Sequence, residues 1–63
     1  MDMTKNEAAA LFELHERSGG IGSQRVYANI AAVAKEFDIE PHVLEGYHFD
    51  LLDSYEKAAV ANG

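Results

Sequence analysis

Apolar residues recur every three or four positions in three separate stretches of the chain, which is the pattern of amphipathic helices packed on a common core. The first stretch predicts a helix over about residues 4–17. Thr4 followed three residues later by Glu7 fits a capping box at its start, and the glycine-rich segment 18–22 ends it. The apolar side expected for this helix is formed by Ala8, Leu11, Phe12, Leu14 and His15.

The second stretch has the most regular helical period and predicts a helix over about residues 24–37. Ser23 is placed to cap its first turn, as serine often does. Asp38 to Glu40 interrupts the pattern before Pro41. The buried side expected for this helix consists of Val26, Ile30, Val33, Ala34 and Phe37.

The third stretch predicts a helix over about residues 41–61, because Pro41 is preorganised for a first helical position. Gly46 within it indicates a close contact or a kink. Its apolar residues cover more of the circumference than one neighbouring helix needs, so we expect part of that surface to form an interface, most simply in a homodimer. These residues are Leu44, Tyr47, Leu51, Tyr55 and Ala58, with Val43, Phe49 and Leu52 beside them.

Composition narrows the class of protein further. The chain has 63 residues, a net charge of −6 and no cysteine, which suits one small domain in a reducing cytoplasm. No apolar run approaches the roughly 20 residues that cross a bilayer, and the first residues lack the positive charge of a secretory signal. Because the negative charge repels phosphates and anionic lipids, we expect a protein partner with a basic surface, no membrane association and no DNA binding.

Residues 30–47 read IAAVAKEFDIEPHVLEGY, and this segment resembles the helix-turn-helix of bacterial and phage regulators, including the mercury-resistance-type and excisionase-like groups. The resemblance covers about a third of the chain. It implies two helices crossing at a tight turn and, as one function, DNA-binding transcriptional regulation. Asp38 stands where the family usually has glycine in the turn. The matching positions are Ala34 at the helix crossing, Ile39 after the turn, Pro41 at the next helix start, and Leu44 and Tyr47 on its buried side.

The charge of the motif's second helix, which is the third predicted helix of the chain, departs from that family. Between Glu36 and Glu56 there are seven acids and neither lysine nor arginine, whereas DNA binding depends on cations that displace counterions from phosphates. Three interpretations remain open. The acidic face binds a basic protein surface, or it only keeps the protein in solution. In the third, the cations gather on another face and contact DNA there; they are Lys5, Arg17, Arg25, Lys35 and Lys57. The seven acids are Glu36, Asp38, Glu40, Glu45, Asp50, Asp53 and Glu56.

Residues that suggest chemistry have structural explanations. Glu45 and His48 have the i, i+3 spacing of di-iron bundles, but such sites need more carboxylates, so we expect no metal. His15 is expected to be hydrogen-bonded at the edge of the core. Ser18, Ser23 and Ser54 lie at a helix end, a cap and an exposed helical position rather than in a nucleophile elbow. We therefore expect neither an enzyme nor a cofactor.

The sequence thus predicts an all-α, three-helix domain over residues 1–63, with a helix-turn-helix-like second and third helix. The predicted function is that of a small acidic regulator which binds another protein, such as a phage or mobile-element inhibitor masking a basic nucleic-acid-binding surface. The alternatives are a DNA-binding transcriptional regulator and a self-assembling structural protein. The residues expected to contact the partner are Glu45, Asp50 and Asp53 by charge, and Tyr47 and Phe49 by aromatic contact.

Overall fold

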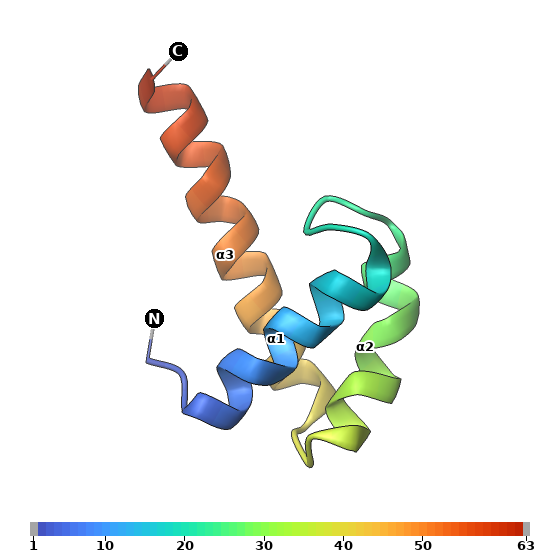
Figure 1. Ribbon diagram of the computed structural model, residues 1–63. Coiled ribbons are helices and arrows are strands. Elements are labelled where there is room, and N and C mark those ends of the chain that lie inside the picture. Colours follow the sequence, from blue (N-terminus) through green and yellow to red (C-terminus); the bar gives the residue numbers. More distant parts are fainter. Residues whose placement is uncertain (1, 63) are drawn as a thin grey trace.

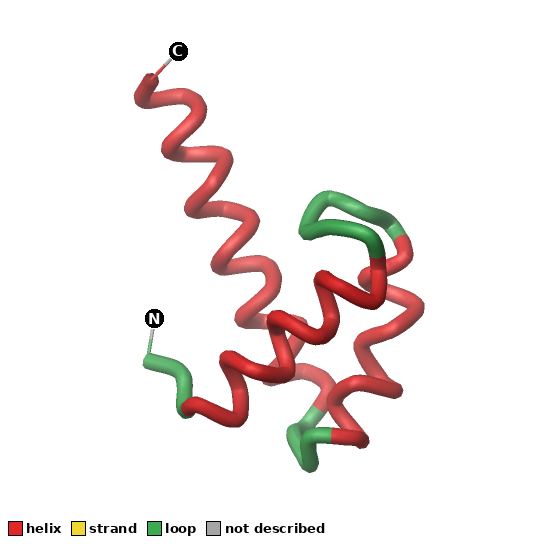
Figure 2. The backbone as a smooth tube through the Cα atoms, in the orientation of Figure 1, coloured by secondary structure: helices red, strands yellow, loops and turns green. Residues whose placement is uncertain are grey.

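The computed structural model describes residues 2–62, with side-chain surroundings for residues 2–60, and consists of three α-helices without strands in that part of the chain. Helix α1 spans Lys5–Ser18, α2 spans Arg25–Glu36 and α3 spans Pro41–Asn62 (Figures 1 and 2). The predicted helices are confirmed, each boundary lying within one residue of its expected position. Helices α1 and α2 lie together, and α3 passes behind α1 and continues beyond both (Figure 1).

Helix α1 begins and ends with hydrogen bonds that its local sequence specifies. The hydroxyl of Thr4 accepts from the Glu7 amide at 3.0 Å, and the Thr4 amide donates to the Glu7 carboxylate at 2.9 Å, which confirms the capping box. At the other end Gly19 has φ 87°, and the Gly20 amide donates to the His15 carbonyl at 2.9 Å. This is a Schellman motif, whose left-handed position favours glycine because a Cβ is strained there.

Helix α2 ends in a second Schellman motif that sets the turn to α3. Asp38 adopts φ 56°, and the Ile39 amide donates to the Ala34 carbonyl at 2.8 Å. Ile39, directly after the turn, packs against the core. At the start of α2 the N-cap position is Gln24, which forms no side-chain capping bond, so the predicted cap lies one residue too early. The Ser23 hydroxyl nevertheless accepts from the Arg25 amide at 3.1 Å. At the end of α2, Asp38 thus adopts the left-handed backbone conformation, which glycine adopts at a lower energetic cost.

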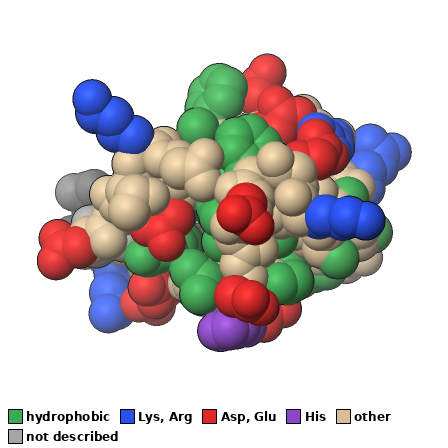
Figure 3. Space-filling model, turned by 90° about the horizontal axis from the view of Figure 1, so that it is seen from below, with side chains coloured by type: hydrophobic (Ala, Val, Ile, Leu, Met, Phe, Trp, Pro, Cys, Tyr) green, Lys and Arg blue, Asp and Glu red, His purple; other side chains and the backbone are tan. Residues whose placement is uncertain are grey.

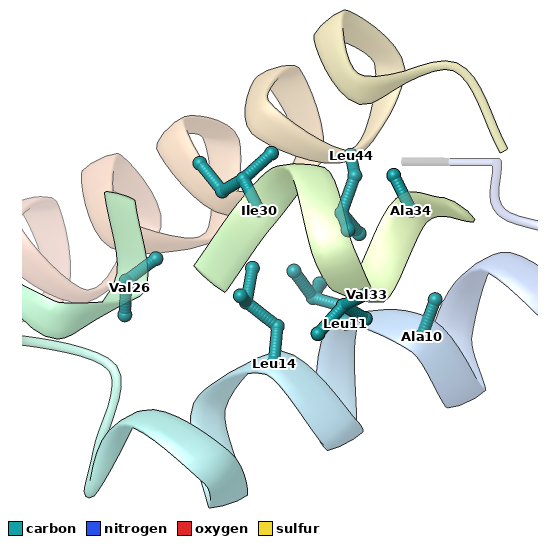
Figure 4. Packing of buried hydrophobic residues seen from close by; sticks show 8 residues of the cluster. All are labelled: Ala10, Leu11, Leu14, Val26, Ile30, Val33, Ala34 and Leu44. Carbon is teal, nitrogen blue, oxygen red and sulfur yellow. The ribbon is translucent and has the colours of Figure 1, made fainter. Parts of the chain in front are cut away.

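The core is small and comes mainly from α1 and α2. Figure 4 shows side chains of all three helices converging, with Leu44 reaching in from α3 toward Val33 and Leu11. Leu44 is the only apolar side chain of α3 among the described residues that is fully enclosed, and Tyr47 and Leu51 pack at the margin. The eight buried apolar residues are Ala10, Leu11, Leu14, Val26, Ile30, Val33, Ala34 and Leu44.

The expected buried side of α1 was partly wrong. Phe12 is 68% exposed and Ala8 is also exposed, whereas Ala10 and Ser18 are buried. The observed side is centred on Leu11, Leu14 and Ser18, at the i, i+3, i+7 spacing of one helical face, and Phe12 lies 100° away from Leu11. Ser18 is accommodated there because its hydroxyl accepts from the Asn29 amide group at 3.0 Å.

The second half of α3 extends away from the other helices. Leu51 and Leu52 are half-buried, and every described residue from Asp53 to Val60 is exposed. The molecule is accordingly elongated, with extents of 38 × 24 × 16 Å. Gly46 is exposed, and a Cβ there would meet nothing within 4 Å, so the expected close contact does not occur.

Truncating one core side chain should unfold a large fraction of the molecules. Leu14 is 0% exposed, so Leu14→Ala removes apolar contacts and leaves a cavity at a cost of about 2 to 5 kcal/mol. A domain of this size rarely has more than about 3 to 5 kcal/mol in total. Phe12→Ala deletes more atoms from an exposed site and should change stability by less than about 0.5 kcal/mol. Urea unfolding in dilute solution, followed by circular dichroism, compares the two, and equal losses would contradict the observed orientation of α1.

Candidate protein-interaction surface

Three of the five predicted contact residues share one exposed face of α3. Glu45, Phe49 and Asp53 follow one another at four-residue spacing, which places them on the same side of a helix. Glu45 and Asp53 are exposed, and Phe49 is 45% exposed. The row continues with Glu56 and with Val60, which is 80% exposed. We call Glu45, Phe49, Asp53, Glu56 and Val60 the outer stripe of α3; it combines carboxylates with two apolar side chains.

The other two predicted contact residues lie elsewhere. Asp50 is exposed but directly follows Phe49, about 100° farther round the helix, so it lies beside the row rather than in it. Tyr47 is half-buried, and its hydroxyl donates to the Glu7 carboxylate at 3.3 Å, a long bond that joins α3 to α1. Burial and the charge of Glu7 raise the pKa of Tyr47. Tyr47 thus already has an intramolecular role and presents little free surface to a partner.

Two of the seven acids are neutralised within the molecule. Lys57 lies 3.0 Å from Asp53, one turn away on the same helix. Glu36, at the end of α2, accepts from Arg17 of α1 at 2.6 and 3.0 Å. Among the described residues the other five acids form no ion pair, so most of the negative charge remains free.

Arg17 joins the ends of α1 and α2. Its guanidinium donates to Glu13 one turn earlier at 2.9 Å and to both Glu36 oxygens. Hydrogen bonding from Arg17 lowers the pKa of the Glu36 carboxyl, and the two carboxylates raise the pKa of Arg17. All three side chains remain substantially exposed, so this pairing orients the helix ends more than it stabilises them.

The cations do not gather on a surface that would fit DNA. Arg17 and Lys57 are engaged by carboxylates, which leaves Lys5, Arg25 and Lys35. Arg25 and Lys35 are ten residues apart on α2, about 15 Å along its axis. In Figure 3 the lysine and arginine side chains lie on opposite sides of the view, with carboxylates between them. Within one chain, no continuous positive strip is formed by the described residues.

A pair of histidines joins α1 to α3 beneath the outer stripe. His15 Nε2 and His48 Nδ1 are 2.8 Å apart, so one imidazole donates a hydrogen to the other. His48 is only 1% exposed. The ring of Phe49 lies 5.8 Å from His48 and 6.0 Å from Tyr27 of α2, between centroids. The histidine pair therefore supports the position of Phe49 from behind.

Both imidazoles are held in their neutral form. Burial lowers the pKa of His15 and of His48, and a charge on His48 lowers that of His15 further. Glu45, one turn before His48, opposes this by raising the pKa of His48. The expectation that His15 is a hydrogen-bonded residue at the core edge is confirmed. The burial of His48 was missed, although its spacing between Leu44 and Leu51 places it on the apolar side of α3.

The residues considered in the sequence as metal ligands or nucleophiles have structural roles in the fold. No group of three or more histidines and carboxylates among the described residues is placed to hold a metal ion. Ser54 donates to the Asp50 carbonyl at 3.0 Å, and the other two serines accept the helix-end bonds given above.

A hollow of about 280 Å³ at the α2–α3 turn is lined by Ala31, Ala34, Lys35, Asp38, Ile39, Glu40 and Pro41.

Comparison with protein-family models, with curated proteins and with solved structures finds no match for this chain. No helix within the described residues is long and apolar enough to cross a bilayer.

The histidine pair should make the domain less stable in mild acid. Because both folded-state pKa values lie below the ordinary 6.5, the neutral pair stabilises the fold fully above about pH 6.5. That contribution is lost as the pH falls below 6.5, since the unfolded chain then binds more protons. Urea unfolding at about pH 7.5 and about pH 5.5 measures the loss.

The third histidine provides the matched control. His42 is exposed at the start of α3, so His42→Gln should retain the pH dependence, whereas His15→Gln should reduce it. If His15→Gln and the unaltered protein lose equal stability over this interval, the pair does not have the assigned role.

Proposed function

We propose that this protein is a small, non-enzymatic regulator that binds another protein through the outer stripe of α3. The partner has a basic surface, and the binding masks that surface from nucleic acid, as an inhibitor from a phage or mobile element does. The observation that carries the proposal is the joint exposure of Glu45, Phe49 and Asp53 on one side of a helix. Carboxylates would steer a basic partner, and Phe49 would supply apolar contact.

The surroundings of Phe49 support this assignment. The ring of Phe49 is nearly half exposed, but its inner side contacts the rings of Tyr27 and His48, which restrict its movement. An aromatic side chain that is already ordered loses little conformational entropy on binding. Glu45, Asp50 and Glu56 of the same helix form no ion pair among the described residues, and their negative charge would accelerate encounter with a cationic surface.

The turn between α2 and α3 favours a second candidate, DNA-binding regulation. Ala34 is buried, Ile39 packs against the core after the turn, and Pro41 opens α3, in keeping with the helix-turn-helix resemblance. The charge of α3 opposes this candidate, because its described part carries four acids and one lysine.

Charge reversal on the outer stripe should abolish capture of the protein partner. Glu45→Lys together with Asp53→Lys should weaken capture from an extract of the native host by at least about tenfold, because attraction becomes repulsion. Both sites are exposed, so thermal stability should change little. Affinity pull-down read by mass spectrometry, followed by titration of the isolated partner, measures the effect.

The matched control changes the net charge equally at other exposed sites. Asp2→Lys together with Glu16→Lys alters two acids outside α3 and should leave specific capture in place. Equal loss in both double variants would indicate a general charge effect and contradict the assigned face. A gel shift at low salt tests DNA binding, and tight, salt-sensitive complexes would favour the second candidate.

A further inference from the structure

The second half of α3 presents another face, distinct from the outer stripe and free of charge. Leu51, Leu52, Tyr55, Ala58 and Ala59 follow an i, i+1, i+4, i+7, i+8 spacing, which forms one continuous apolar band along a helix. We call these five residues the inner band. The charged residues of this half, Asp50, Asp53, Glu56 and Lys57, all lie outside its arc.

The inner band begins inside the body and continues beyond it. Leu51 packs at the margin of the core, Leu52 is half-buried, and Tyr55 is 60% exposed. Ala58 and Ala59 are exposed. Among the described residues no other helix reaches this part of α3 (Figure 1). The band that faces the body at Leu51 is therefore largely uncovered one turn later, at Tyr55.

The exposed surface of the molecule is somewhat larger than that of a compact monomer, in keeping with the projection of α3. A chain of 6.9 kDa in a compact monomer exposes about 4,000 Å². This chain exposes 4361 Å². Helical segments of ten or so residues are also marginal in water unless their apolar side is packed. Both facts favour an occupant for the inner band.

We infer that the inner band binds the inner band of a second copy of this chain, in an antiparallel pair of α3 helices related by a twofold axis near Tyr55. Two chains of net charge −6 repel each other over most of their surfaces. The inner band is the part of the projecting α3 where they can meet without bringing like charges into contact. A basic protein, by contrast, would gain nothing from this face.

Side-chain size favours the antiparallel arrangement. Large residues, Leu51 and Leu52, occupy one end of the band, and small residues, Ala58 and Ala59, occupy the other. A twofold axis at Tyr55 places Leu51 opposite Ala59 and Leu52 opposite Ala58, so that each large side chain meets a small one. Parallel pairing would set leucine against leucine and alanine against alanine, leaving gaps where the alanines meet.

The size of this contact sets the expected affinity. A contact of about three helical turns is at the small end of specific interfaces, so a dissociation constant of about 10 to 100 µM is expected.

This dimer does not rest on the proposed function, since it uses a different side of the same helix. The outer stripe of each copy stays outside the contact, and dimerisation presents two such stripes on one particle. Self-association needs only the purified chain, whereas partner capture needs an extract of the native host, so failure of one is distinguishable from failure of the other.

Sedimentation equilibrium of the purified protein tests the self-association. From about 5 µM to about 1 mM the apparent mass should rise from that of the 6.9 kDa chain toward twice that value. Ala58→Glu puts a charge into the inner band and should hold the protein monomeric. Val60→Glu adds the same charge on the outer stripe and should leave the dimer intact. A monomer at every concentration, larger closed oligomers, or equal behaviour of the two variants would overturn the inference.

Disulfide formation tests the antiparallel orientation, because the natural chain has no cysteine. Tyr55→Cys places a thiol near the twofold axis, opposite its own copy, and should form a covalent dimer rapidly on mild oxidation. Ala59→Cys faces Leu51 in the antiparallel pair and should crosslink far more slowly. Similar rates at both positions would indicate parallel pairing and overturn the arrangement, with circular dichroism confirming that both variants remain helical.

Discussion

The attachment of α3 to the rest of the molecule is the constraint on which the structure depends. Leu44 is the only apolar side chain of α3 that is fully buried among the described residues. One turn later on the same helix, the buried imidazole of His48 is hydrogen-bonded to His15 of α1. Beyond Leu51 there is no core left to cover, since α1 and α2 have already used their apolar sides on each other. The length of α3 therefore exceeds what the body can bury, and the described part of its second half is exposed to solvent from Asp53 onward.

The histidine pair fills a place that a hydrocarbon side chain takes in most small cores. Two neutral imidazoles satisfy one another only while one donates and the other accepts, so this contact depends on protonation in a way that Leu44 does not. Because the pair lies directly behind Phe49, loss of the bond in acid would loosen the base of the outer stripe. Stability and the geometry of the candidate binding face are thus linked through one hydrogen bond.

Charge is arranged to leave α3 acidic on one side and neutral on the other. Arg17 is engaged with carboxylates at the junction of α1 and α2, far along the chain from the outer stripe. Lys57 neutralises only Asp53. The remaining acids of α3 form no ion pair among the described residues, whereas the inner band contains no charged side chain. One helix can in this way carry an electrostatic contact and a self-association contact without conflict between them.

Local chemistry in the sequence determined the three helices and their ends. Thr4 with Glu7, Ser23, and the turn at Asp38 each act over a few residues, so their effects were predictable without the fold. The exposure of Glu45, Phe49 and Asp53 on one face followed from spacing alone, although their role in binding stays a prediction.

Only the tertiary structure decided which sides of the helices are buried and which distant residues meet. Periodicity marks an apolar arc but not its centre, and so Phe12 was assigned to the core although α1 is rotated to bury Leu14 and Ser18 instead. The bond between His15 and His48 joins residues 33 positions apart, and no local pattern contains it. Such contacts depend on how the three helices pack together to bury a small number of apolar side chains. That packing is a property of the whole fold and not of any single segment.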